Sequence, residues 1–151
     1  MIGIMNVELR RANKEDIPAL IGFEKKVAGS RLFSPMLTEK EWLKAFETDE
    51  IYFIEADGAS VGELSYEIKS PAHAYFSGLV VDPTFQGRGV GTKAIQLALE
   101  RLAAIPKIDL VTHPENEAAI KIYQSFGFKI TERLENYFGD GEPRVRMVLE
   151  R

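Results

Sequence analysis

Three glycines at alternate positions, Gly87, Gly89 and Gly91, stand between an apolar run and a segment with helical periodicity. Alternating glycines weaken regular structure, because glycine loses more backbone freedom on folding than any other residue. At the start of a helix, however, they let an anion approach N–H groups that lack helical partners. The pattern therefore indicates a phosphate-binding turn, with a tightly packed turn that binds nothing as the alternative. Arg88 could add a charge to a bound phosphate or could simply be solvated.

Two narrower nucleotide-binding motifs fit this turn less well. A Walker phosphate loop needs Gly-Lys-Ser/Thr, whereas residues 91–93 read Gly-Thr-Lys. The permissive dinucleotide fingerprint is matched by Gly89, Gly91 and Ala94, but it belongs after the first strand of a βαβ unit. Here the glycines follow three consecutive predicted strands. A generic anion-binding turn is the interpretation that remains.

Two segments carry a resemblance to a known family. Residues 79–100, LVVDPTFQGRGVGTKAIQLALE, resemble the acyl-CoA signature of the GNAT superfamily of N-acetyltransferases: an apolar strand, a proline turn and Gln/Arg-x-x-Gly-x-Gly/Ala. Residues 116–128, NEAAIKIYQSFGF, resemble that family's second motif, Asn-x-x-Ala-x-x-x-Tyr-x-x-x-Gly-Phe. The order of the predicted elements also matches, so the resemblance covers nearly the whole chain. The motif positions are occupied by Gln86, Gly89, Gly91, Asn116, Ala119, Tyr123, Gly127 and Phe128.

The resemblance implies that the chain binds acetyl-CoA and passes its acetyl group to a primary amine. Asn116 would contact the CoA arm, although capping a helix is its simpler role. Tyr123 would also line the cofactor site and serve the leaving thiolate as general acid, with core packing as the alternative. The residues implied to hold the pantetheine arm are Leu79, Val80 and Val81, and those implied to bind the pyrophosphate are Gln86, Gly87, Arg88, Gly89, Val90, Gly91 and Thr92.

The base that deprotonates the amine is less evident. An alkyl ammonium has a pKa near that of lysine, ~10.4, so its proton must be removed before attack. Glu63 and Glu67 are four residues apart on a predicted strand, so both side chains lie on one face of it. Glu63 is therefore a candidate catalytic residue, and the alternative is that both are ordinary exposed carboxylates. Tyr75 could reach a cleft or pack in the sheet. His113 could act as a base or lie in a surface loop.

The carboxyl-terminal segment, residues 133–150, resembles the peptide N-terminal acetyltransferases, including those that act on ribosomal proteins. Members of that branch often carry Glu or His five residues before the motif asparagine, and Val111 occupies that position here. Tyr137 and Phe138 could shape an acceptor pocket or simply pack. A peptide N-terminus and a small amine such as a polyamine both stay open as acceptors.

The elements that must position these residues form one mixed α/β domain over residues 1–151, with a single, largely antiparallel sheet flanked by helices. An Asp-Gly hairpin signal joins the second and third strands. The glycine turn opens a helix with apolar residues at every fourth position, Val90 to Leu102. We expect strands at 7–12, 51–56, 60–68, 74–81, 108–112, from 128 and at 144–150, and helices after Asn13, after Thr38, at 90–102 and at 116–126.

Composition narrows the possible functions. The chain has 151 residues, no cysteine, two histidines and a formal charge of −4. A thiolate nucleophile is therefore excluded, a metal site is not expected, and direct transfer in a ternary complex is favoured over an acyl-enzyme. No basic excess points to nucleic acid, and no apolar run approaches the ~20 residues of a membrane span. We expect no signal peptide, a cytoplasmic protein, and a possible homodimer.

Overall fold

The computed structural model describes residues 5–151. The first four residues, which belong to the N-terminal segment in which no signal peptide is expected, lie outside the described residues. No helix among the described residues is long and apolar enough to cross a membrane. The strands and α-helices, in chain order, are β1 (Val7–Arg11), α1 (Ile17–Lys25), α2 (Glu39–Thr48), β2 (Glu50–Ala56), β3 (Ala59–Ser70), β4 (His73–Val81), α3 (Val90–Arg101), β5 (Lys107–Thr112), α4 (Glu117–Ser125), β6 (Lys129–Leu134) and β7 (Arg144–Glu150).

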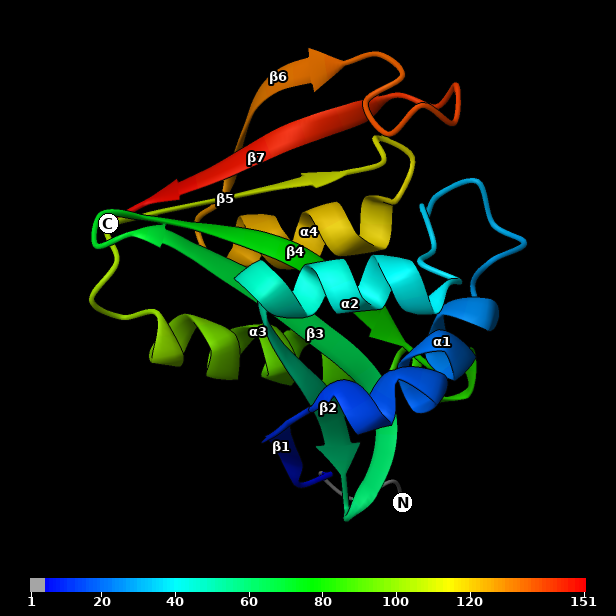
Figure 1. Ribbon diagram of the computed structural model, residues 1–151. Coiled ribbons are helices and arrows are strands. Elements are labelled where there is room, and N and C mark those ends of the chain that lie inside the picture. The colour runs from blue at the N-terminus through cyan, green and yellow to red at the C-terminus, as the bar shows by residue number, and fades with distance from the viewer. Residues whose placement is uncertain (1–4) are drawn as a thin grey trace.

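The strands form one open sheet in the order β1-β2-β3-β4-β5-β7-β6 (Figure 1). Every neighbouring pair is antiparallel except β4 and β5, which run parallel. The parallel pair needs a crossover, and α3 supplies it. The predicted mixed, largely antiparallel sheet flanked by helices is thus confirmed.

Alternation along β2 divides the core into two layers. Ile51 and Phe53 pack with Trp42 of α2 and Leu20 of α1 in one cluster. Tyr52 and Ile54 belong to the other cluster, which holds the apolar stripe of α3 and Tyr123 of α4. Because successive strand residues face opposite sides, α1 and α2 cover one face of the sheet, while α3 and α4 cover the other.

The first residues of the helices are preceded either by a capping side chain or by a glycine. Asn13 forms a capping box with Asp16, although the first turn there is a 3-10 helix, Lys14–Asp16, that leads into α1. Thr38 accepts a hydrogen bond from the Glu41 N–H and caps α2, as predicted. Gly89 has no side chain to offer, and α3 begins without a side-chain cap. Unlike the helix starts at Asn13 and Thr38, the start of α3 therefore has no side chain that accepts hydrogen bonds from its first N–H groups.

Strands β4 and β5 diverge after a short contact. Their register joins residues 73–75 to residues 107–109, and no pairing continues beyond that among the described residues. On its other side β4 carries a bulge, because Ser65 lies opposite Gly78 while Tyr66 lies opposite Phe76, which leaves Ser77 as the extra residue. Beyond this contact, the rest of β4 and the rest of β5 separate from each other on the side where α4 lies (Figure 1). The strand that precedes the glycine turn is thereby opened on the side facing β5.

A glycine in β3, Gly62, lets the backbone of the opened strand β4 approach closely. A Cβ on Gly62 would lie 2.2 Å from the carbonyl oxygen of Val80, which is far inside van der Waals contact. We predict that Gly62→Ala lowers the free energy of unfolding by about 2 kcal/mol, since the backbone of β4 must shift. Gly22→Ala is the matched control: it lies within α1 with no heavy atom within 4 Å, and alanine should stabilise the helix. Urea denaturation of both variants tests this, and equal stability would contradict it.

Candidate active site

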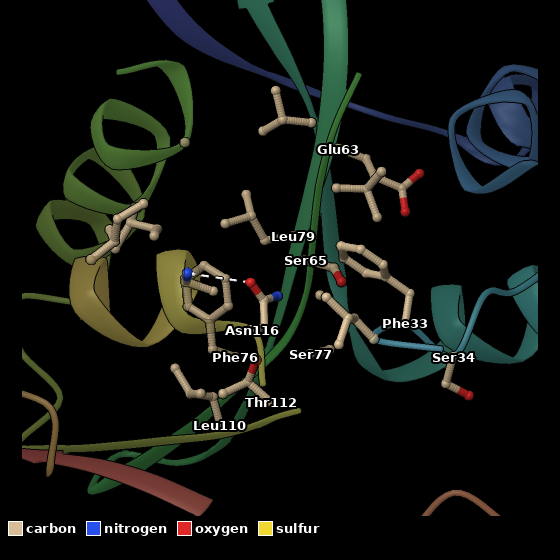
Figure 2. A pocket seen from close by; sticks show the side chains of 18 of the residues that line it. Phe33, Ser34, Glu63, Ser65, Phe76, Ser77, Leu79, Leu110, Thr112 and Asn116 are labelled. Atoms are coloured by element: carbon tan, nitrogen blue, oxygen red, sulfur yellow. Dashed lines mark hydrogen bonds between the residues drawn. The ribbon is translucent and has the colours of Figure 1, made fainter. Parts of the chain in front are cut away.

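A cavity of about 900 Å³ lies where β4 and β5 diverge. One part of it is bounded by the glycine turn and the start of α3, the middle by the ends of β4 and β5 and by α4, and the far part by the segment between α1 and α2. Figure 2 shows lining side chains on both sides of β4, with Leu79 on the side of α3 and with Glu63 and Phe33 on the side of α1 and α2. The residues predicted from the sequence that line it are Glu63, Leu79, Val80, Val81, Gln86, Gly87, Gly89, Val90, Gly91, Thr92, Asn116 and Tyr123.

The glycine turn presents backbone N–H groups to the cavity. Gly87 and Gly89 both have φ of +78°, in the left-handed region where other residues are strained. The Lys93 N–H donates to the Gly89 carbonyl at 3.0 Å and makes the first bond of α3, so the N–H groups before it have no partner within the helix. The first turn of α3 carries no acidic residue. This geometry suits an anion such as a pyrophosphate.

Side chains near the glycine turn hold the segment that leads from β4 into it. A second 3-10 helix, Pro83–Phe85, precedes the glycines, and Asp82 caps it by accepting from the Thr84 N–H at 3.0 Å. Lys26 contacts the same carboxylate, and together with that N–H it lowers the pKa of Asp82 to about 2. The Gln86 Nε2 donates to the Val81 carbonyl at 3.1 Å and ties the turn to the end of β4. These contacts hold the turn against the strand that forms the cavity wall.

Arg88 differs from the other residues predicted for the turn. Its guanidinium lies 5.4 Å from the centre of the Phe85 ring, and Arg88 does not line the cavity. A stacked guanidinium is partly held by the ring. In this structure, therefore, the turn lines the cavity without the Arg88 side chain, and the Arg88 charge contact stays a prediction.

Two α4 residues face the middle of the cavity. Asn116 caps the helix, with its Oδ1 accepting from the Ala119 N–H at 3.4 Å (Figure 2). Tyr123 is buried, and its ring meets Phe76 and Phe128 edge-on with ring centres 6.3 and 5.6 Å away. Burial raises the pKa of Tyr123 well above the ordinary value for a phenol. The hydroxyl is thus protonated at neutral pH, and the two aromatic contacts position the ring that carries it.

Glu63 lies on the α1 and α2 side of β3, where it meets a second carboxyl. Glu63 is 5% exposed and Glu24 of α1 is 7% exposed, and both line the cavity. Burial raises the pKa of Glu63 well above its ordinary value, and the neighbouring Glu24 raises it further. Burial also raises the pKa of Glu24. Both carboxyls therefore hold a proton more readily than an exposed glutamate does.

Three other residues suggested as functional lie outside the cavity lining. Glu67 shares a face with Glu63 but lies farther along β3, where its carboxylate is 3.8 Å from the Lys69 ammonium. Tyr75 packs on the sheet, where burial and its neighbour Tyr137 raise its pKa. Tyr137 accordingly contacts Tyr75 and does not line the cavity. The strand alternation that pairs Glu63 with Glu67 is real, but only Glu63 reaches the cavity.

His113 fits neither of its predicted roles. It is fully buried, so it is not a surface loop residue. Its Nδ1 accepts the Glu115 N–H at 3.1 Å, and its Nε2 lies 2.8 Å from a Glu142 carboxylate oxygen. Both ring nitrogens are thus occupied in joining the β5–α4 turn to the β6–β7 loop, and His113 does not line the cavity.

Several lining residues were not predicted. The far part of the cavity is walled by the aromatic side chains of Phe33 and Trp42. Phe138, which was predicted either to shape an acceptor pocket or simply to pack, also lines it. Arg144 is buried at this end, where its guanidinium donates to Asp140 at 3.0 Å. Glu24 had a signal in the sequence, because it occupies a position on the apolar stripe of α1. A carboxylate at such a position needs an explanation that an exposed one does not.

Comparison with protein families gives one match that spans most of the chain. The family model described as "Acetyltransferase (GNAT) family" matches residues 17–128. Among curated proteins, spermidine N(1)-acetyltransferase of Escherichia coli K12 is 29% identical over 111 residues, which cover 68% of this chain and 59% of that protein. N-alpha-acetyltransferase 30 of Xenopus laevis is 29% identical over 97 residues, covering 63% of this chain and 36% of that protein. The chain thus spans about a third to three fifths of the length of these relatives.

Among solved structures, the ribosomal-protein-S18-alanine N-acetyltransferase of Escherichia coli superposes with a TM-score of 0.81 at 21% sequence identity. The alignment covers 96% of this chain and 94% of that one. At this level of identity the likeness concerns the fold, and it agrees with the sheet order and the four helices described above.

Proposed function

Because the chain belongs to the GNAT acetyltransferase family, an N-acetyltransferase fold that uses acetyl-CoA as donor, we propose that it moves the acetyl group directly to a primary amine within a ternary complex. The observation that carries this proposal is the continuity of the cavity. It extends from the backbone N–H groups of the glycine turn to the buried phenol of Tyr123. Acetyl-CoA is an extended molecule that fits this arrangement, with its anionic diphosphate at the glycine turn and its thioester near Tyr123.

Each part of the cavity has a task in this proposal. The first N–H groups of α3 bind the pyrophosphate, with the open space at Gly87 and Gly89 admitting it. The separated half of β4 offers its backbone groups, from Leu79 to Val81, to the pantetheine arm. Asn116 supports that arm, and Tyr123 gives its proton to the departing thiolate. Glu63 lies on the opposite side of β4, where the acceptor amine would enter.

The acceptor is proposed to be a primary amine, either a small molecule or a peptide N-terminus. Relatives named for spermidine and for protein N-termini support both possibilities. Val111 lines the cavity where the peptide branch often carries a base, so this chain needs another group for that step. The aromatic wall formed by Phe33 and Trp42 suits an acceptor with an apolar part next to its amine.

The proposal is tested by calorimetric titration of acetyl-CoA, followed by an acetylation screen of polyamines, aliphatic amines and short peptides with thiol release as readout. We expect saturable binding and turnover with at least one amine class. Binding without turnover on any amine would indicate an acyl-CoA sensor instead. No binding at all would indicate a partner-binding module on the same fold and would end the enzyme proposal. The metal-free reaction, the cytoplasmic location and the homodimer stay predictions.

A further inference from the structure

The pair formed by Glu24 and Glu63 is not explained by folding alone. The two carboxyls come from α1 and β3, on different elements that meet at the cavity. Within residues 5–151, the Glu63 Oε2 is the single buried side-chain polar atom without a hydrogen-bond partner. An unpaired buried polar atom is costly, so it calls for an explanation. Figure 2 shows the Glu63 side chain projecting from β3 toward the helices, away from Leu79.

Among the residues that the structure describes, no lysine, arginine or histidine forms an ion pair with Glu24 or Glu63. The residues opposite Glu63 on the neighbouring strands are Phe53 of β2 and Val80 of β4. On the helix side, the charged group that acts on the pair is Glu41 of α2, which raises the pKa of Glu24. Two adjacent buried carboxylates repel each other, so one proton is kept between them.

The nearby cations are engaged by other carboxylates. Lys26, which follows α1, contacts Asp82. Arg31, in the segment between α1 and α2, contacts Glu115 and Glu142. The pair with one proton carries one negative charge in a buried part of the cavity beside Glu41, which is where an ammonium group would be favoured.

Among the described residues, the other groups that could remove a proton from the amine are occupied or misplaced. Two further carboxylates, Glu41 and Asp49, line the cavity. Glu41 accepts from the Thr38 hydroxyl at 2.7 Å, and Asp49 accepts from the Thr48 hydroxyl at 2.8 Å.

Val111 has no titratable group, and both nitrogens of His113 are hydrogen-bonded outside the cavity. Glu67 lies outside the cavity lining. Tyr123 is a protonated phenol at neutral pH and serves the thiolate instead.

We infer that Glu24 and Glu63 act as one carboxyl pair, which holds a single proton and accepts a second one from the ammonium group of the acceptor. This inference rests on the proposed acetyl transfer and names its acceptor as a cationic aliphatic amine. In the step, an N–H bond of the ammonium breaks and an O–H bond forms on the pair, leaving a neutral amine and two protonated carboxyls. The amine attacks the thioester, and its second proton replaces the one that Tyr123 gives to the thiolate. The pair then releases its extra proton to water, so each turnover yields one proton.

The test compares Glu63→Gln and Glu24→Gln with the control Glu67→Gln, which lies on the same strand outside the cavity. Glutamine resembles a protonated glutamate in shape and charge, so the variants should fold and bind acetyl-CoA. With an aliphatic amine at pH 7, we expect kcat/KM to fall at least about 30-fold in Glu63→Gln, as the loss of a general base requires, and to stay unchanged in the control. With an aromatic amine, which is already neutral at pH 7, the fall should be less than about threefold. Equal losses for both amines would make the role of the pair structural and overturn the inference.

A second readout does not depend on activity. Glu63 binds its proton more tightly in the folded than in the unfolded chain, so stability is lost as pH rises above the unfolded value of ~4.3. The melting temperature of the wild type should therefore fall between pH 5 and pH 8 by more than that of Glu63→Gln. The infrared carbonyl stretch of a protonated carboxylic acid should be present at pH 7 and lost in Glu63→Gln. Its absence from the wild type would refute the pair even if acetyl transfer is found, whereas its presence without any turnover would refute the proposed function instead.

Discussion

Tyr123→Phe is expected to lower kcat about 100-fold or more while leaving the affinity for acetyl-CoA unchanged. The substitution removes one oxygen atom and keeps the ring, so the edge-on packing against Phe76 and Phe128 persists. What it removes is the proton that the leaving thiolate takes up. Thiol release measured at saturating amine, together with a calorimetric titration of acetyl-CoA, separates the loss of chemistry from a loss of binding.

Tyr75→Phe is the matched control for this substitution. Tyr75 is also a tyrosine with a raised pKa on the sheet, but it does not line the cavity. Its replacement should leave kcat within about twofold, as expected for a group that touches no reacting atom. If Tyr123→Phe keeps the wild-type kcat, the phenol is a packing residue and another proton source must be sought. Because burial raises the pKa of Tyr123, no loss of activity from its ionisation is expected below about pH 10.

The local features of this chain could be read from its sequence because they depend on neighbouring residues. The helix caps at Asn13 and Thr38 and the left-handed glycines before α3 are set within a few positions. The glycine turn and the α4 motif also indicated which residues share the cavity. With the exception of Arg88, the residues predicted for cofactor binding line one cavity.

The features that the sequence did not reveal depend on contacts between distant elements. The bulge at Ser77 is set by the register between β3 and β4, and no residue type marks it. Glu24 continues the helical spacing of Ile17 and Leu20, and only the packing of α1 against β3 brings its carboxyl to the same cavity as Glu63. His113 is buried because Glu142, on a remote loop, reaches its Nε2. Each of these three features depends on contacts between residues far apart in the sequence rather than on the local propensity of any residue.

Gly89→Trp is expected to weaken the binding of acetyl-CoA at least about 100-fold, since several charge-assisted hydrogen bonds to the pyrophosphate would be lost. A Cβ on Gly89 meets no heavy atom within 4 Å, so the indole would project into the open space beside the first turn of α3. The φ of +78° adds backbone strain of about 1–2 kcal/mol to any substitution there. Binding and folding must therefore be measured separately, by calorimetric titration and by thermal unfolding.

Gly58→Trp supplies the comparison that isolates the anion site. Gly58 has a φ of +84° and open space at its Cβ, like Gly89, but it lies in the turn between β2 and β3 and does not line the cavity. Both variants thus carry similar strain and a similar exposed indole, and only one obstructs the start of α3. Lost binding in Gly89→Trp with retained binding in Gly58→Trp would assign the pyrophosphate to the N–H groups of the turn. Retained binding in both folded variants would mean that the donor enters elsewhere, because no anion can contact a helix start covered by an indole.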